Sequence, residues 1–171
     1  MIRISKPTLA RATFASVALV VGAGIYFLDR QPDSVYFLAD WWAWSGSTSR
    51  FFGTLGNQLP TFIHPFAFIL LTAVIVSPSC RHAVAICLLW LFIDSFFEVC
   101  QVPAIAQGIA NQVPEWFAGV PVLENTSNYF LSGTFDVLDL IAIAVGALAA
   151  YLILVASVGE EAKHASDIQT Q

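Results

Sequence analysis

The sequence predicts an all-α membrane protein, a polytopic helical bundle with four transmembrane helices in a single membrane domain. Composition is the first observation, because 57% of the 171 residues are hydrophobic and only 11% are charged, whereas soluble domains carry about 25% charged residues. The second is that four apolar segments reach the roughly 17–25 residues that a crossing helix needs. The expected spans cover residues 12–28, 60–76, 83–101 and 134–158.

The first span, 12–28, follows the basic residues Arg3, Lys6 and Arg11, which also resemble the start of a signal peptide. No small-x-small cleavage signal closes the segment, so we expect a retained helix. Ala18 and Gly22 form a small-xxx-small pair, a pattern typical of helix packing in membranes.

The first long connection, 29–59, carries Trp41, Trp42 and Trp44, and a short interfacial helix is expected in it. Tryptophan beside a span is typical of an anchor at the membrane surface. Tryptophan is also enriched at binding hot spots, so the same group could dock another membrane protein. Both interpretations remain open at this point.

The second span begins at Pro60, and we expect Pro65 within its first turn or so, where a missing N–H does little harm. His64 lies beside it, near the start of the span. The third span, 83–101, carries Asp94, Glu98 and Gln101. Their spacing of i, i+4 and i+7 puts them on one face of a helix. An acid inside a span costs roughly 2.5–3.5 kcal/mol on insertion scales, so something must offset that cost.

The second long connection, 102–133, has no Lys or Arg and is broken by prolines. Its aromatic residues suggest short helices that lie on the bundle and the membrane surface. The fourth span, 134–158, is expected to be capped by Ser132 or Thr134. A polar tail, 159–171, is expected to be loose. Small residues follow one another along one face of the fourth span, at Ala142, Gly146 and Ala150.

Basic residues predict the orientation. Four crossings put both termini and the turn at Arg81 on one side of the membrane. That side holds Arg3, Lys6, Arg11, Arg81 and Lys163, whereas the other side holds Arg30 and Arg50. The positive-inside rule therefore places both termini in the cytoplasm and both long connections outside.

This topology brings six polar side chains from three helices into the outer leaflet. They are His64, Asp94, Glu98, Gln101, Asp136 and Asp139. Four carboxylates this close cannot all stay ionised in a low dielectric, so a cation, a protonation switch or a cationic headgroup is one interpretation. The other is structural: the acids are protonated, exposed to water or, for Asp136, suited to the positive end of a helix.

Several function classes find no support in the sequence. The net charge of −5 comes without a basic cluster, so we expect no nucleic-acid partner. The three cysteines show no zinc-ligand spacing and are expected to be free thiols, and no cofactor is predicted. GxSxG, HExxH and nucleotide-binding motifs are absent. His64 with a carboxylate could act as an acid–base pair, but no nucleophile stands out, so we expect no enzyme.

Three motifs carry a resemblance. They are His64-Pro65-Phe66-Ala67-Phe68, then Glu98-Val99-Cys100-Gln101, then Gly133-Thr134-Phe135-Asp136-Val137-Leu138-Asp139, followed by Gly146. Residues 60–151 thereby resemble the VanZ-like family of small bacterial membrane proteins, named after a teicoplanin-resistance protein. The family often has Arg where this chain has Thr134 and Asn where it has Ile143. The resemblance implies a bacterial inner-membrane protein with a role in the cell envelope, touching glycopeptide or lipid-linked chemistry.

Two functional hypotheses follow. In the first, the polar cluster of a VanZ-like membrane protein binds a cation or a lipid headgroup. In the second, the chain is a non-catalytic accessory subunit of a larger membrane complex, respiratory or photosynthetic, and docks through its tryptophan-rich loop and its helix faces. The lipid bilayer is a partner in both.

Overall fold

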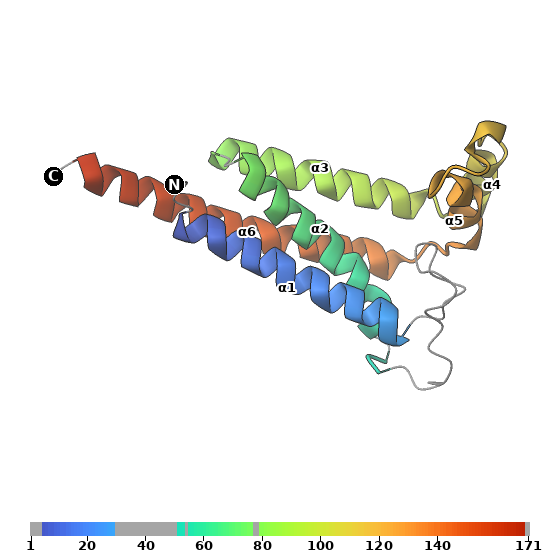
Figure 1. The fold of residues 1–171 in the computed structure, drawn as a ribbon, viewed down its shortest axis with the longest axis horizontal. Helices are drawn as coiled ribbons and strands as arrows, with labels where there is room; N and C mark the ends of the chain where they lie inside the picture. The colour runs from blue at the N-terminus through green and yellow to red at the C-terminus, as the bar shows by residue number, and fades with distance from the viewer. Residues whose placement is uncertain (1–4, 30–50, 54, 77–78, 170–171) are drawn as a thin grey trace.

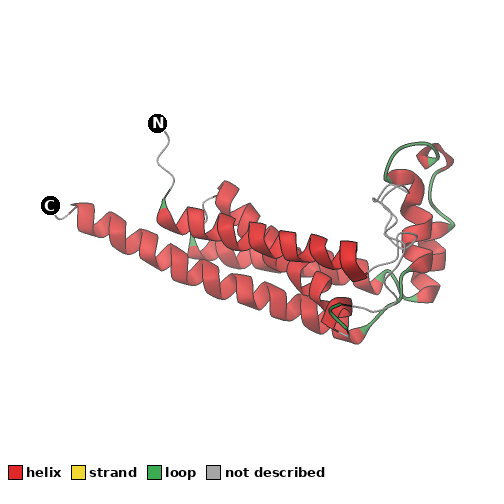
Figure 2. Cartoon of the chain, turned by 60° about the horizontal axis from the view of Figure 1, so that its bottom comes forward, coloured by secondary structure: helices red, strands yellow, loops and turns green. Residues whose placement is uncertain are grey.

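The computed structural model describes residues 5–29, 51–53, 55–76 and 79–169, except the side chains of Cys80 and of residues 160–169. Within these residues all regular structure is helical, as predicted (Figure 2). Four long helices are α1 (Lys6–Asp29), α2 (Leu55–Val76), α3 (Cys80–Val99) and α6 (Val137–Gln169). Between α3 and α6 lie two short helices, α4 (Pro103–Ala110) and α5 (Thr126–Ser132), and 3-10 turns at Glu115–Phe117 and Leu123–Asn125.

All four long helices are long and apolar enough to cross a membrane, which confirms the predicted number of spans. The outward-facing sides of these helices carry large, exposed apolar side chains at helical spacing. Examples on α3 are Leu88 and Phe92, which are 58% and 68% exposed. A protein in water rarely exposes continuous apolar faces of this kind, so these surfaces fit a membrane protein.

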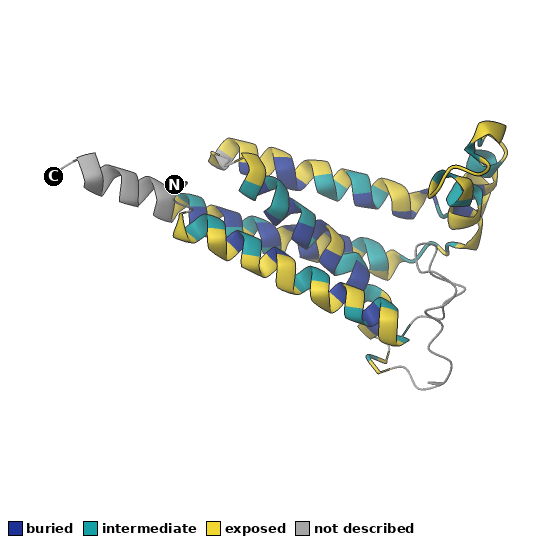
Figure 3. Cartoon of the chain, in the orientation of Figure 1, coloured by how far each residue is buried: buried dark blue, intermediate teal, exposed yellow. Residues whose placement is uncertain are grey.

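Figure 1 shows α2 in the middle of the bundle, with α1 and α3 on either side of it and α6 alongside. The start of α1 and the end of α6 lie at one end of the bundle, which we call the terminal end. The opposite end, where α4 and α5 lie, is called the loop end. Buried positions lie along α2 and along the faces of α1, α3 and α6 that face the inside of the bundle (Figure 3).

Small residues let α6 and α1 approach α2 closely, as their spacing predicted. Gly146 of α6 is buried, and a Cβ atom there would collide with the carbonyl oxygen of Phe62 on α2. Ala150, one turn further on, is fully buried. On α1, a Cβ atom at Gly22 would lie 3.3 Å from a methyl carbon of Ile63.

The predicted start of the second helix, Pro60, was wrong. Helix α2 begins at Leu55 and contains both Pro60 and Pro65. A contact with the end of α1 explains the early start. Asp29 accepts hydrogen bonds from the backbone N–H groups of Phe51 (2.7 Å) and Phe52 (2.8 Å). A Cβ atom at Gly56 would lie 2.7 Å from Asp29 Oδ2, so a glycine allows the first turn to pack against this carboxylate.

Both bounds of α6 also differ from expectation. The cap is Asp136, whose Oδ1 accepts the backbone N–H of Leu138 at 2.9 Å, so the expected caps Ser132 and Thr134 were wrong. An acid suits this place because it satisfies an N–H and faces the positive end of the helix. The helix then continues to Gln169, through the expected loose tail, because Glu, Ala and Lys are strong helix formers.

Arg11 was expected outside the first span, but α1 begins at Lys6 and the Arg11 side chain is fully buried. Its Nε donates a hydrogen bond of 2.8 Å to Ser157 Oγ on α6, which donates to the carbonyl of Leu154. This contact joins α1 and α6 near the terminal end. Cys87 and Cys100 are buried free thiols, as expected for those two residues.

Candidate functional site

An open cavity of about 1230 Å³ lies at the loop end of the bundle. It lies between α1 and α3, which pack against α2 and α6, and residues of α5 and of the segment before α6 complete it. Many of the lining residues carry a polar side chain. These are Tyr26, Asn57, Gln58, Thr61, His64, Asp94, Glu98, Gln101, Asn128, Tyr129, Ser132, Thr134, Asp136 and Asp139.

The cavity is about two helical turns deep. Lining positions cover residues 19–26 of α1, 57–64 of α2, 94–101 at the end of α3 and 136–143 at the start of α6. Each stretch corresponds to roughly 10 Å at about 1.5 Å per residue. All four long helices therefore line the cavity over the same two turns at the loop end of the bundle.

His64 and Asp94 form the connection between α2 and α3. His64 Nδ1 lies 2.8 Å from Asp94 Oδ1, so a protonated Nδ1 donates a hydrogen bond to the carboxylate. The two side chains differ in exposure, at 51% for His64 and 9% for Asp94. The imidazole ring packs on Phe68 with a centroid distance of 4.4 Å, and Phe68 stacks on Trp90 at 4.9 Å. This aromatic row fixes the ring that faces Asp94.

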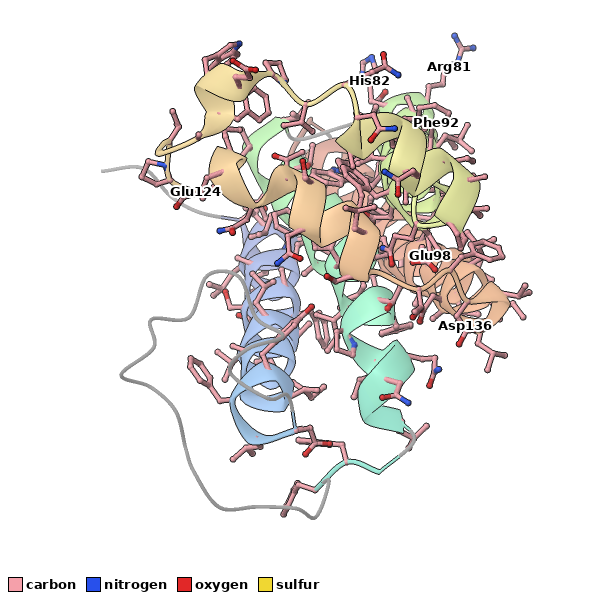
Figure 4. All side chains as sticks on the ribbon, turned by 90° about the vertical axis from the view of Figure 1, so that its right-hand side faces the viewer. Arg81, His82, Phe92, Glu98, Glu124 and Asp136 are labelled. Atoms are coloured by element: carbon pink, nitrogen blue, oxygen red, sulfur yellow. The ribbon has the colours of Figure 1, made fainter. Side chains whose placement is uncertain are left out.

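Glu98 connects α3 to the start of α6. Its Oε1 accepts the backbone N–H of Asp136 at 2.8 Å, and the two residues lie side by side at the loop end (Figure 4). Asp139, one turn into α6, accepts a hydrogen bond of 3.1 Å from Thr61 Oγ1 of α2. Asp136 and Asp139 are close enough to Glu98 for their negative charges to repel its own. Three carboxylates thus share one wall of the cavity.

Gln101 lies just after α3 and packs against the segment before α6. A Cβ atom at Gly133 would collide with the Gln101 amide, so a larger residue there would displace the Gln101 side chain. Burial raises the pKa of the Tyr129 hydroxyl, and the neighbouring Tyr26, Glu98 and Asp94 raise it further. A hydrogen bond with Gln101 acts in the opposite direction.

The structure brings all six sequence-predicted polar residues to this cavity: His64, Asp94, Glu98, Gln101, Asp136 and Asp139. Sequence reasoning missed Asn57, because the second span was expected to begin at Pro60. It also missed Thr61, although this residue lies inside the expected span. A signal was present, since Asn57, Thr61 and His64 repeat the i, i+4, i+7 spacing of the acidic face. The lining residues of α1 gave no such signal, because apolar side chains on a crossing helix normally face lipid.

Trp41, Trp42 and Trp44 lie outside the described residues, so their anchoring or docking role stays a prediction. Among the described residues, no group of three or more His, Cys, Asp and Glu side chains is placed to hold a metal ion.

Comparison with known proteins found no match to this chain. No family model, no curated protein and no solved structure matches the chain. The resemblance to VanZ-like proteins thus rests on the motifs quoted above, of which His64, Glu98, Gln101, Asp136 and Asp139 line the cavity.

Proposed function

We propose that this chain is a VanZ-like protein of the bacterial inner membrane that binds a cation or a cationic headgroup in the cavity at its loop end. One observation supports this most directly. Four carboxylates line the cavity, and none of its described lining residues is Lys or Arg. His64 is the one side chain there that gains a positive charge on protonation.

Electrostatics favours a positively charged occupant. Two like charges about 4 Å apart repel by about 1 kcal/mol in water and by about 4 kcal/mol near a protein surface. Each carboxylate already has a hydrogen-bond partner on one oxygen. Asp136 accepts from the Leu138 N–H and Asp139 from Thr61. Glu98 accepts from the Asp136 N–H, and Asp94 faces His64. A cation bound in the cavity would offset the repulsion between these carboxylates.

A thermal-unfolding measurement on the purified full chain in a neutral detergent tests this proposal. A bound cation raises the unfolding temperature, by a free energy of about 2.7 kcal/mol at 100 times its Kd. Mg²⁺, Ca²⁺, Mn²⁺ and ethylammonium are the probes. The expected shift is present in the native protein, is lost in Glu98→Gln, and is kept in Glu124→Gln, an exposed acid outside the cavity. If none of these cations shifts unfolding, the proposal is wrong.

The proposed orientation puts both termini in the cytoplasm and the cavity in the outer leaflet, in line with the positive-inside rule. Single cysteines in a cysteine-free chain test it. An impermeant maleimide should label Ser132→Cys in intact cells, and Arg81→Cys only after permeabilisation. Both positions are exposed, so burial does not hide either one. Labelling in the reverse order would place the cavity on the cytoplasmic side.

A further inference from the structure

The two walls of the cavity differ in chemistry. The wall formed by α1 consists of Leu19, Gly22 and Ala23, with Tyr26 nearest the loop end. The opposite wall, from α3 and the start of α6, carries the four carboxylates. A ligand that fills this space therefore meets hydrocarbon on one side and negative charge on the other.

A bare metal ion does not fit these walls well. The described His, Cys, Asp and Glu side chains form no group that could hold one. The volume of about 1230 Å³ is also far above the roughly 30 Å³ that one water molecule takes in the liquid. The size of the cavity and the lack of such a group among the described residues both favour an organic cation over a bare metal ion.

Asp94 supplies a second, independent observation. Its side chain is only 9% exposed, and its Oδ1 faces His64. Its other oxygen, Oδ2, is buried and has no hydrogen-bond partner among the described residues, although Asp94 lines the cavity. A buried carboxylate oxygen without a donor is costly, and an N–H group carrying positive charge would satisfy it.

We infer that the occupant is an amphiphile with an ammonium group, whose nitrogen faces Asp94 Oδ2 and Glu98 while its hydrocarbon lies along Leu19, Gly22 and Ala23. This inference rests on the proposed function and names its ligand class. The aromatic residues Tyr26, Phe97 and Tyr129, which also line the cavity, suit a cation because ring faces attract positive charge. A lipid with a primary-amine headgroup and a free long-chain amine share this chemistry.

Two binding measurements on the purified full chain separate these sources. Native mass spectrometry with equal amounts of phosphatidylethanolamine and phosphatidylglycerol tests the lipid, and calorimetry with dodecylammonium tests the free amine. Selective retention of phosphatidylethanolamine identifies a headgroup, and dodecylammonium binding without it identifies a free amine. Binding of Mn²⁺ with neither ammonium compound overturns the inference but leaves the proposed function standing. Binding of no cation at all overturns both.

Single substitutions test which wall contacts the ammonium group and which contacts the hydrocarbon. Asp94→Asn should lower affinity for the ammonium ligand at least tenfold, whereas Glu124→Gln should leave it unchanged. Ala23→Phe, at an exposed position, should weaken dodecylammonium binding at least tenfold and ethylammonium binding less than twofold. Equal effects of Ala23→Phe on both amines would show that the hydrocarbon does not lie along α1. Unchanged affinity in Asp94→Asn would show that the Asp94 carboxylate does not bind the ammonium group.

Discussion

Replacing Gly146 by Ala should force α2 and α6 apart. The new Cβ atom would collide with the carbonyl oxygen of Phe62, and it would lie 3.2 Å from the Phe62 carbonyl carbon and 3.3 Å from Pro65 Cγ. None of these atoms belongs to a flexible side chain, so the strain cannot be relieved by a rotamer change. The helices themselves must move.

The size of the effect follows from two opposing terms. Overpacking a well-packed core costs about 1–3 kcal/mol, while Ala is a better helix former than Gly by up to about 1 kcal/mol. Gly24→Ala is the matched control, because it is a helical glycine with no atom within 4 Å of its added Cβ. The difference in unfolding free energy between the two variants cancels the helix-forming term and is expected to be about 1–3 kcal/mol.

Thermal unfolding in a neutral detergent, followed by size-exclusion of the remaining folded protein, measures the difference. At this chain length each kcal/mol corresponds to about 2–4 °C in Tm, so Gly146→Ala should unfold several degrees below Gly24→Ala. The bond between Thr61 and Asp139 also joins α2 to α6, so Gly146→Ala should weaken cation binding as well. Equal unfolding temperatures for the two variants would refute the close contact of α2 and α6.

Three further predictions concern single contacts. Ser157→Ala removes the acceptor of the buried Arg11 Nε and should cost about 1.5–3 kcal/mol, the range for a hydrogen bond to a charged group, in the same unfolding assay. Thr72→Val removes the acceptor of Trp90 Nε1 and should cost about 1 kcal/mol and change tryptophan emission. The Tyr129 hydroxyl, whose pKa burial raises above about 10, should ionise later than an ordinary tyrosine. Its contribution to stability is then complete below pH 10 and is lost as the pH rises through the raised pKa.

The controls for these predictions are variants that lack the contact. Ser16→Ala is the control for Ser157→Ala, and Thr13→Val is the control for Thr72→Val. Ser16 and Thr13 are exposed residues of α1, so both controls should leave the unfolding free energy unchanged. A control that loses as much unfolding free energy as its partner variant would contradict the assigned hydrogen bond. For the tyrosine, phenolate absorbance of the native protein minus that of Tyr129→Phe isolates one group. A titration midpoint at or below pH 10 would mean that the surroundings of this hydroxyl do not disfavour the phenolate.

The sequence by itself determined the number of crossings and the helical fold. A crossing helix needs one uninterrupted apolar stretch, because every backbone N–H and C=O group must be satisfied within the segment, and such a stretch is visible without any contact. Helical periodicity likewise put Asp94 and Glu98 on one face, and both are buried as that face requires. The small-residue spacing around Gly146 also identified a packing face.

Only the tertiary structure decided which side chains meet. Pairs such as His64 with Asp94, or Arg11 with Ser157, depend on how far each helix is rotated and shifted along its neighbour. Those shifts are set by close contacts at particular residues, such as Asp29 against Gly56, which periodicity does not record. For the same reason the apolar wall of the cavity on α1 was invisible in the sequence: a leucine that faces lipid and a leucine that faces a cavity have the same pattern.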